Sequence, residues 1–210
     1  MQADDVTLDL MGFSLTGIGK SNNGIVLAGI RSNVEIRNGS LCNFNGSGIY
    51  ALDNGCKGIR VTSLRVRDTL STGIYLGGTD HLVVDCSVKS AGGHGIYAGT
   101  GSLVKSNLVI NNTEYGMRAS YGSTVVGNVA ASNLRGIAAL PVSSVTDNAV
   151  SGNSSDGIAA ADYCTVTRNT AYNNTGTGIA TGNYCTITNN TADGLTYGSN
   201  CTLAVNTAAP

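Results

Sequence analysis

The chain has 210 residues, a formal net charge of −1 at pH 7 and charged side chains at only 12% of its positions. This near-neutral balance argues against a nucleic-acid-binding protein, and no run of about 18 apolar residues is present to cross a membrane. Apolar residues make up 41% of the chain, which excludes a disordered tail. The first residues, Met1–Asp5, have neither the basic nor the apolar region of a signal peptide.

Short segments of alternating apolar and polar residues begin at residues 6–10 and continue along the chain. A glycine followed by a large apolar residue then recurs at intervals of 16 to 25 residues. In one such segment, 73–76, the alternation points Ile74 and Leu76 inward and Tyr75 outward. Alternation over so few residues is typical of strands, and no segment has apolar positions at helical spacing over three turns. The recurrent glycines are Gly24, Gly48, Gly73, Gly95, Gly116, Gly136, Gly157, Gly178 and Gly194.

Three short strands in each repeat cannot close a core alone, but they can form one coil of a solenoid. Each strand then pairs with the equivalent strand one coil away. We therefore predict an all-β fold: a single-stranded, right-handed parallel β-helix of about nine coils, with about 21 residues per coil. We expect one domain over residues 1–210, with longer, more charged coils in 1–118 and regular coils rich in Thr and Asn in 119–210.

Polar and small residues recur where the coils must bend. The recurrent asparagines are predicted to stack at the turns and to hydrogen-bond along the axis, and the recurrent glycines are predicted to supply positive φ at the third corner. Cys164, Cys185 and Cys201 fall at equivalent inward positions, which predicts a column of small buried side chains. The recurrent asparagines are Asn107, Asn128, Asn148, Asn169 and Asn190, together with Asn112, Asn133, Asn153 and Asn174.

A row of aromatic residues is the first candidate for a functional surface. Tyr50, Tyr75 and Tyr97 take the same outward position on three successive coils, and Arg118 takes it on the fourth. Such a row could stack on sugar rings, and the charged residues Asp85 and Glu114 could bind hydroxyls or carboxylates. These six residues are therefore the predicted ligand-binding site. The alternative is an aromatic ladder that only stabilises the parallel strands.

A row of threonines on a second face is another candidate. Thr165 and Thr167 on one coil are matched by Thr186 and Thr188 on the next. This arrangement resembles β-solenoid ice-binding proteins, which implies that the face could order water. The alternative is that threonine is simply favoured on strand surfaces.

The segment Gly92–Ile96, Gly-Gly-His-Gly-Ile, followed by Arg118, resembles the polygalacturonase family of β-helix glycoside hydrolases. In that family a Gly-His-Gly motif lies one coil from two catalytic Asp residues, and an Arg-Ile-Lys motif follows. The resemblance implies that His94 and Arg118 are catalytic candidates. The chain departs from the pattern because no acid lies near Ser71–Gly73 and Ser120 stands at the lysine position, so the carboxylates that glycoside hydrolysis needs are missing.

No set of residues has the spacing of a metal site. The cysteines form no Cys-x-x-Cys pair and no cluster with histidine, and His81, beside Asp80, is predicted to lie in a solvated turn. The Asp cluster with which β-helix pectate lyases hold calcium is also absent. We therefore expect neither a metal nor another cofactor.

Taken together, the segment Val6–Phe13 and the repeated Asn and Asp-Gly-Ile units resemble bacterial right-handed β-helix repeat proteins. The resemblance implies a location outside the cell or at its surface and an association with carbohydrate. We expect a non-catalytic scaffold or a module that binds an acidic polysaccharide. The alternatives are an enzyme on uronic-acid polysaccharides with its site at His94 and Arg118, a filament or tail-fibre segment that self-associates through its coil ends, and ice binding.

Overall fold

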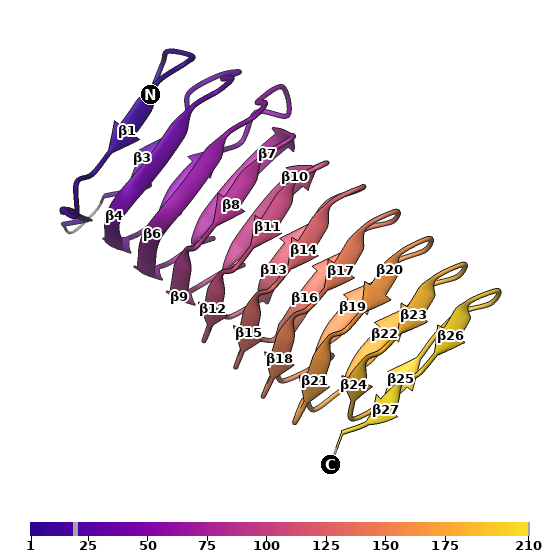
Figure 1. Cartoon of the computed structure of the whole chain (residues 1–210). Helices are drawn as coiled ribbons and strands as arrows, with labels where there is room; N and C mark the ends of the chain where they lie inside the picture. The colour runs from indigo at the N-terminus through magenta and orange to yellow at the C-terminus, as the bar shows by residue number, and fades with distance from the viewer. Residues whose placement is uncertain (19–20, 210) are drawn as a thin grey trace.

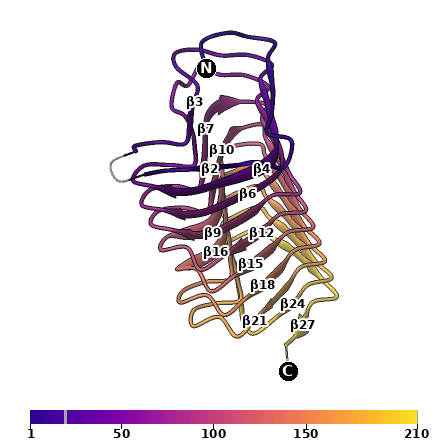
Figure 2. The same ribbon diagram turned by 90° about the vertical axis from the view of Figure 1, so that its left-hand side faces the viewer.

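The computed structural model describes residues 1–18 and 21–209, which form one elongated stack of coils with the two termini at opposite ends (Figure 1). All regular elements in this described part are β-strands, and they form two parallel sheets. Figure 2 shows the coils stacked one behind another along a common axis. No helix among the described residues is long and apolar enough to cross a membrane. The predicted all-β solenoid is confirmed.

The larger sheet has 18 strands, and most coils contribute two strands to it. Its strands are β1 (Thr7–Asp9), β2 (Ser14–Thr16), β4 (Glu35–Phe44), β6 (Arg60–Thr69), β8 (Leu82–Val84), β9 (Ser87–Ala91), β11 (Leu103–Lys105), β12 (Leu108–Ile110), β14 (Thr124–Val126), β15 (Val129–Ala131), β17 (Ser144–Thr146), β18 (Ala149–Ser151), β20 (Thr165–Thr167), β21 (Thr170–Tyr172), β23 (Thr186–Thr188), β24 (Thr191–Ala192), β26 (Thr202–Ala204) and β27 (Thr207–Ala208).

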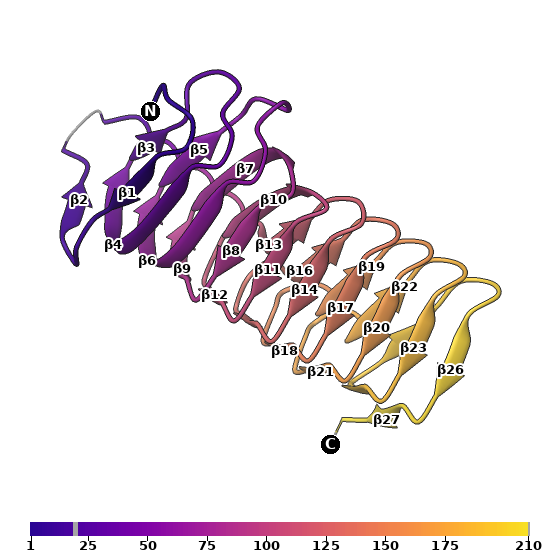
Figure 3. The ribbon, with the colours of Figure 1, turned by 45° about the horizontal axis from the view of Figure 1, so that its top comes forward.

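The smaller sheet has nine strands, one per coil, which lie side by side along the stack (Figure 3). Nine strands enclose eight complete turns, close to the predicted nine coils. The strands are β3 (Ile25–Val26), β5 (Ile49–Ala51), β7 (Ile74–Thr79), β10 (Ile96–Thr100), β13 (Tyr115–Ala119), β16 (Arg135–Ala139), β19 (Ile158–Ala160), β22 (Ile179–Thr181) and β25 (Leu195–Thr196).

Equivalent residues of successive coils align in columns, as the repeat predicts. On the smaller sheet Ile49 pairs with Ile74, and Ile74 pairs with Ile96. All three side chains are completely buried. Because each inward residue packs on its counterpart one coil away, the core is a continuous apolar column. Outward residues align in the same way, so the surface also consists of columns.

The two predicted asparagine ladders are confirmed. Asn128 Oδ1 accepts a hydrogen bond from the backbone N–H of Asn107 at 2.8 Å, and Asn128 Nδ2 donates to Oδ1 of Asn148 at 3.0 Å. In the second ladder, Asn133 is linked in the same way to Asn112 and Asn153. These buried amides satisfy backbone groups at bends, where the strand ladder is interrupted.

A third ladder runs along the remaining corner and contains the predicted cysteine column. The N–H of Cys164 lies 3.4 Å from Sγ of Cys185, and the N–H of Cys185 lies 3.4 Å from Sγ of Cys201. Earlier coils use serine at this position: the N–H of Ser102 donates to Oγ of Ser123 at 3.2 Å. Cys164 and Cys185 are buried, Cys201 is half-buried, and all three are free thiols.

The prediction that His81 is solvated is wrong. His81 begins the third ladder, is only 2% exposed and places Nε2 2.8 Å from the carbonyl of Gly77. Nδ1 accepts a hydrogen bond from the N–H of Ile59 at 3.2 Å, so the imidazole is neutral. Burial lowers the pKa of His81, which favours the same neutral form. The side chain is buried because, at this corner, the residue that follows the left-handed residue Asp80 points inward.

The recurrent glycines serve a different purpose from the predicted one. Among the nine, only Gly194 has a φ in the left-handed region, at 149°. A Cβ on Gly95 would lie 2.2 Å from Cγ1 of Val109 and 2.6 Å from the carbonyl oxygen of Gly116. The eight recurrent glycines other than Gly194 are therefore required because neighbouring coils approach too closely for any side chain. The positive φ values at the corners belong mostly to the residue before each ladder residue, such as Asp147 at 57°.

Candidate functional site

The predicted row of outward residues exists on the smaller sheet. Tyr50 pairs with Tyr75, Tyr75 with Tyr97, and Tyr97 with Arg118 on consecutive strands. The rings of Tyr75 and Tyr97 stack with centroids 4.6 Å apart and an interplanar angle of 6°. Tyr50 is tilted by 40° against Tyr75 at 5.6 Å. The guanidinium carbon of Arg118 lies 5.5 Å from the ring centroid of Tyr97. We call these four residues the tyrosine row.

Stacking within the tyrosine row determines which atoms a ligand can reach. Because Tyr97 lies between Tyr75 and Arg118, both faces of its ring are occupied, and the ring presents its edge and hydroxyl. The Tyr97 hydroxyl accepts a hydrogen bond from Oγ of Ser120 at 3.3 Å. Burial raises the pKa of Tyr75, with smaller contributions from Tyr97 and Tyr50, so its hydroxyl remains a hydrogen-bond donor. The row therefore suits hydrogen bonding better than stacking on sugar faces.

A second column lies beside the tyrosine row and was not predicted. His94 stacks on Tyr115 with centroids 5.0 Å apart and planes 4° apart. The guanidinium carbon of Arg135 lies 5.3 Å from the Tyr115 ring, and Arg135 also forms an ion pair with Asp156 at 3.0 Å. Each of these residues directly precedes a recurrent glycine. That fixed place in the repeat is the sequence signal that could have revealed the column.

His94 connects the two columns, because its ring also lies 6.3 Å from the ring of Tyr97. Its Nδ1 lies 2.8 Å from Oε2 of Glu114, although the contact lacks hydrogen-bond alignment. Burial is the main cause that lowers the pKa of His94; Arg118 lowers it further and Glu114 opposes both. Burial thus favours the neutral imidazole, which can accept a proton.

A shallow groove of about 350 Å³ begins at the end of the tyrosine row. Its floor is formed by Ala138, Ala159 and Ala180, which follow Arg118 in register. Tyr115, Arg118 and Arg135 line one end. No carboxylate lines this groove among the residues that the structure describes. The arrangement places two guanidinium groups beside an open, uncharged channel.

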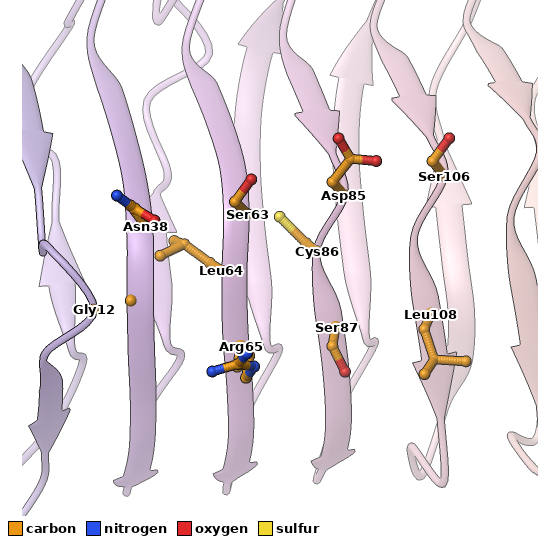
Figure 4. A pocket seen from close by; sticks show the side chains of 11 residues that line it. Gly12, Asn38, Ser63, Leu64, Arg65, Asp85, Cys86, Ser87, Ser106 and Leu108 are labelled. Carbon is orange, nitrogen blue, oxygen red and sulfur yellow. The ribbon is translucent and has the colours of Figure 1, made fainter.

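Asp85 is not brought to the tyrosine row. It follows β8 in the larger sheet, whereas the tyrosine row lies on the smaller sheet. Asp85 instead lines a separate groove of about 520 Å³ with Arg65, and Figure 4 shows Ser63, Asp85 and Ser106 as a row across neighbouring coils. In the same groove, burial raises the pKa of Cys86 to about 11, so its thiol is not a ready nucleophile.

The threonine face is present but partly bonded to itself. Thr165 pairs with Thr186 and Thr167 with Thr188 on β20 and β23. The hydroxyls of Thr167 and Thr188 share a hydrogen bond, while Thr165 and Thr186 are exposed. Ice binding by this face remains a prediction. Within residues 1–18 and 21–209, no group of three or more His, Cys, Asp or Glu side chains is placed to hold a metal ion.

Comparison with solved structures finds β-helix proteins at low sequence identity. The A-module of mannuronan C-5 epimerase AlgE4 from Azotobacter vinelandii is 14% identical with a TM-score of 0.73, over 99% of this chain and 82% of that module. Pectate lyase Pel9A is 16% identical with a TM-score of 0.56, over 88% of this chain and 54% of that protein. PfbA, a surface adhesin of Streptococcus pneumoniae, is 11% identical with a TM-score of 0.53, over 99% of this chain and 60% of the adhesin.

These similarities show the fold alone, because each identity is below one residue in five. Comparison with curated protein sequences finds no match. A family model described as the right handed beta helix region matches residues 14–134 and 72–208, which together span nearly all of the chain. The match also shows that the β-helix is right-handed, as predicted from the sequence. The chain therefore belongs to the right-handed β-helix family.

Proposed function

We propose that this protein binds an acidic polysaccharide, built from uronic acids, along the tyrosine row and the alanine-floored groove. The observation that carries the proposal is Arg118, which lies at the junction of the two. None of the ion pairs among the described residues includes Arg118, so its guanidinium has no carboxylate partner. A guanidinium held against the Tyr97 ring is well placed to bind a sugar carboxylate.

The surroundings of Arg118 suit the same ligand. Arg135, although ion-paired with Asp156, adds guanidinium hydrogen-bond donors at the end of the groove, and the hydroxyls of Tyr75 and Tyr97 add polar groups. Similar folds occur in a mannuronan epimerase, a pectate lyase and a surface adhesin, which supports a polysaccharide ligand and a location outside the cell or at its surface. Binding alone requires no paired carboxylates, which the sequence lacks at the polygalacturonase positions.

Replacing Arg118 tests this proposal. We expect Arg118→Gln to weaken binding of oligogalacturonate or oligomannuronate by about tenfold to a hundredfold, because a charge-assisted hydrogen bond is lost. Isothermal titration calorimetry would measure the affinity. Arg67→Gln is the matched control: it makes the same charge change on β6 of the larger sheet, away from the groove. Equal losses in both variants would indicate only a general charge effect and contradict the assignment.

Binding of neither oligomer by the unmodified protein would reject the polysaccharide function altogether. A scaffold that assembles through its coil ends would then become the stronger hypothesis. Light scattering over a range of concentrations would test it, since end-to-end assembly requires the mean mass to rise with concentration.

A second candidate function is catalysis on the same polysaccharide, favoured by the neutral form of His94 beside Arg118. A uronate has an acidic C5–H bond next to its carboxylate. A neutral imidazole could take that proton while Arg118 stabilises the negative charge that develops on the carboxylate. Delivery of a proton from water to the opposite face of C5 then gives the epimer, and the imidazolium releases its proton to solvent. In the alternative outcome the C4–O4 bond breaks, a double bond forms between C4 and C5, and the departing O4 takes a proton from the imidazolium or from water.

Two measurements test the catalytic candidate. We expect exchange of the C5 proton with D2O, seen by NMR, or the ultraviolet absorbance of an unsaturated uronate. His94→Gln should reduce either rate by at least about a hundredfold, as expected for loss of a general base, while retaining polysaccharide binding. Absence of both signals in the unmodified protein, or an undiminished rate in His94→Gln, would remove His94 from catalysis and leave the binding function intact.

A further inference from the structure

A second pair of stacked tyrosines lies at the third corner of the C-terminal coils. Tyr163 and Tyr184 stack with centroids 4.9 Å apart and planes 3° apart. Their φ angles are 59° and 57°, in the left-handed region that disfavours residues with a Cβ. In other coils the same left-handed corner is formed by Asp80, Gly101, Gly122, Val142 and Asn200, so the corner does not require an aromatic residue.

Burial does not explain why tyrosine occupies these strained positions. Tyr163 and Tyr184 are 58% and 52% exposed, so about half of the surface of each residue remains in water. Asn200, one coil further along, shows that the corner forms without an aromatic ring. Two exposed rings that stack on each other, at a corner that Val142 and Asn200 form without a ring, point to a surface contact rather than to a need of the fold.

The position of the pair connects it with the alanine-floored groove. The groove is lined by Ala161 and Thr181, which lie two residues before Tyr163 and three residues before Tyr184. At about 3.3 Å per extended residue, the backbone at Tyr163 and Tyr184 lies within about 7–10 Å of these groove-lining residues. A polysaccharide that runs along the groove away from Arg118 therefore reaches this corner within a few sugar units.

We propose that Tyr163 and Tyr184 form an outlying binding platform for the same acidic polysaccharide. The pair contacts sugar units beyond those held by Arg118, through ring edges, hydroxyls and the uncovered outer ring faces. This inference rests on the proposed function. It predicts that affinity increases with oligomer length until the chain spans both sites.

Replacing both rings with asparagine separates binding from stability. In the double variant Tyr163→Asn/Tyr184→Asn we expect affinity for an octasaccharide of galacturonate or mannuronate to fall about tenfold, while affinity for a disaccharide stays unchanged. The melting temperature should stay the same or rise, because asparagine tolerates the left-handed conformation. Tyr172→Asn, which removes a half-exposed ring from β21 on the larger sheet, is the control and should not affect either affinity.

Each outcome decides the proposal. Equal affinity of the unmodified protein and the double variant for the octasaccharide would overturn the platform and leave the Arg118 site standing. A clear fall in melting temperature would show that the stacked pair serves the fold, which would also overturn it. Failure of the unmodified protein to bind any oligomer would instead reject the proposed function on which the platform rests.

Discussion

Substitution of Gly95 by alanine is expected to destabilise the protein by about 3 kcal/mol or more, near the upper limit for overpacking a protein core. The added Cβ would lie 2.2 Å from Val109 Cγ1 and 2.6 Å from the carbonyl oxygen of Gly116. Gly95 cannot shift away from these atoms, because its N–H donates to the carbonyl of Tyr115 and its carbonyl accepts a hydrogen bond from the N–H of Ile74. Urea denaturation followed by circular dichroism would measure the change in unfolding free energy.

Gly122→Ala is the matched control for this substitution. A Cβ at Gly122 meets no atom within 4 Å, but φ there is +65°, so alanine adds only backbone strain of about 1 kcal/mol. The two variants thus separate a clash between coils from an unfavourable conformation. If Gly122→Ala were as damaging as Gly95→Ala, the close approach of neighbouring coils would not be the reason for the recurrent glycine.

The fold could be predicted from the sequence because the repeat carries its own register. Tyr50, Tyr75 and Tyr97 follow the recurrent glycine at the same distance, and the structure pairs them on adjacent strands. The same logic predicted both asparagine ladders and the cysteine column. In a solenoid, equal position in the repeat means contact in space, so sequence spacing alone identifies neighbours.

The purpose of a recurring residue was harder to infer than its position. A glycine that needs positive φ and a glycine that has no room for a Cβ recur with the same spacing, and only the coordinates distinguish them. The left-handed corners are held instead by residues as different as Asp147 and Arg168, which show no pattern in the sequence. The burial of His81 was missed for a related reason. The equivalent positions in later coils hold serine and then cysteine, so no repeated residue type marks this column in the sequence.

The candidate site was predicted in part. The tyrosine row and Arg118 were found because like residues repeat, whereas the column of His94, Tyr115 and Arg135 was missed because its residue types change at every coil. Asp85 was wrongly grouped with the row on sequence proximity. It follows Tyr75 by ten residues, roughly half a coil of about 21 residues, which carries it to the other sheet.

Replacing Asn148 with alanine is expected to cost about 4 kcal/mol of unfolding free energy, because several buried polar groups lose their partners together. Asn148 Nδ2 donates to the carbonyls of Val125 and Thr146 and to Oδ1 of Asn169. Its Oδ1 accepts from the backbone N–H and the side-chain amide of Asn128. Except for the partly buried bond to Thr146, these hydrogen bonds are buried at a bend, where neither the neighbouring strands nor water can replace them.

Asn189→Gly is the control for the ladder, since it removes the same amide from an exposed residue beside the ladder residue Asn190. Glycine accepts the φ of 57° found there, so we expect a change below about 1 kcal/mol. Urea denaturation would measure the unfolding free energy of both variants. An unchanged dependence of that free energy on urea concentration would confirm that unfolding remains two-state. Similar small losses in the two variants would mean that the stacked amides contribute little. The solenoid would then be held together by its apolar column and strand pairing alone.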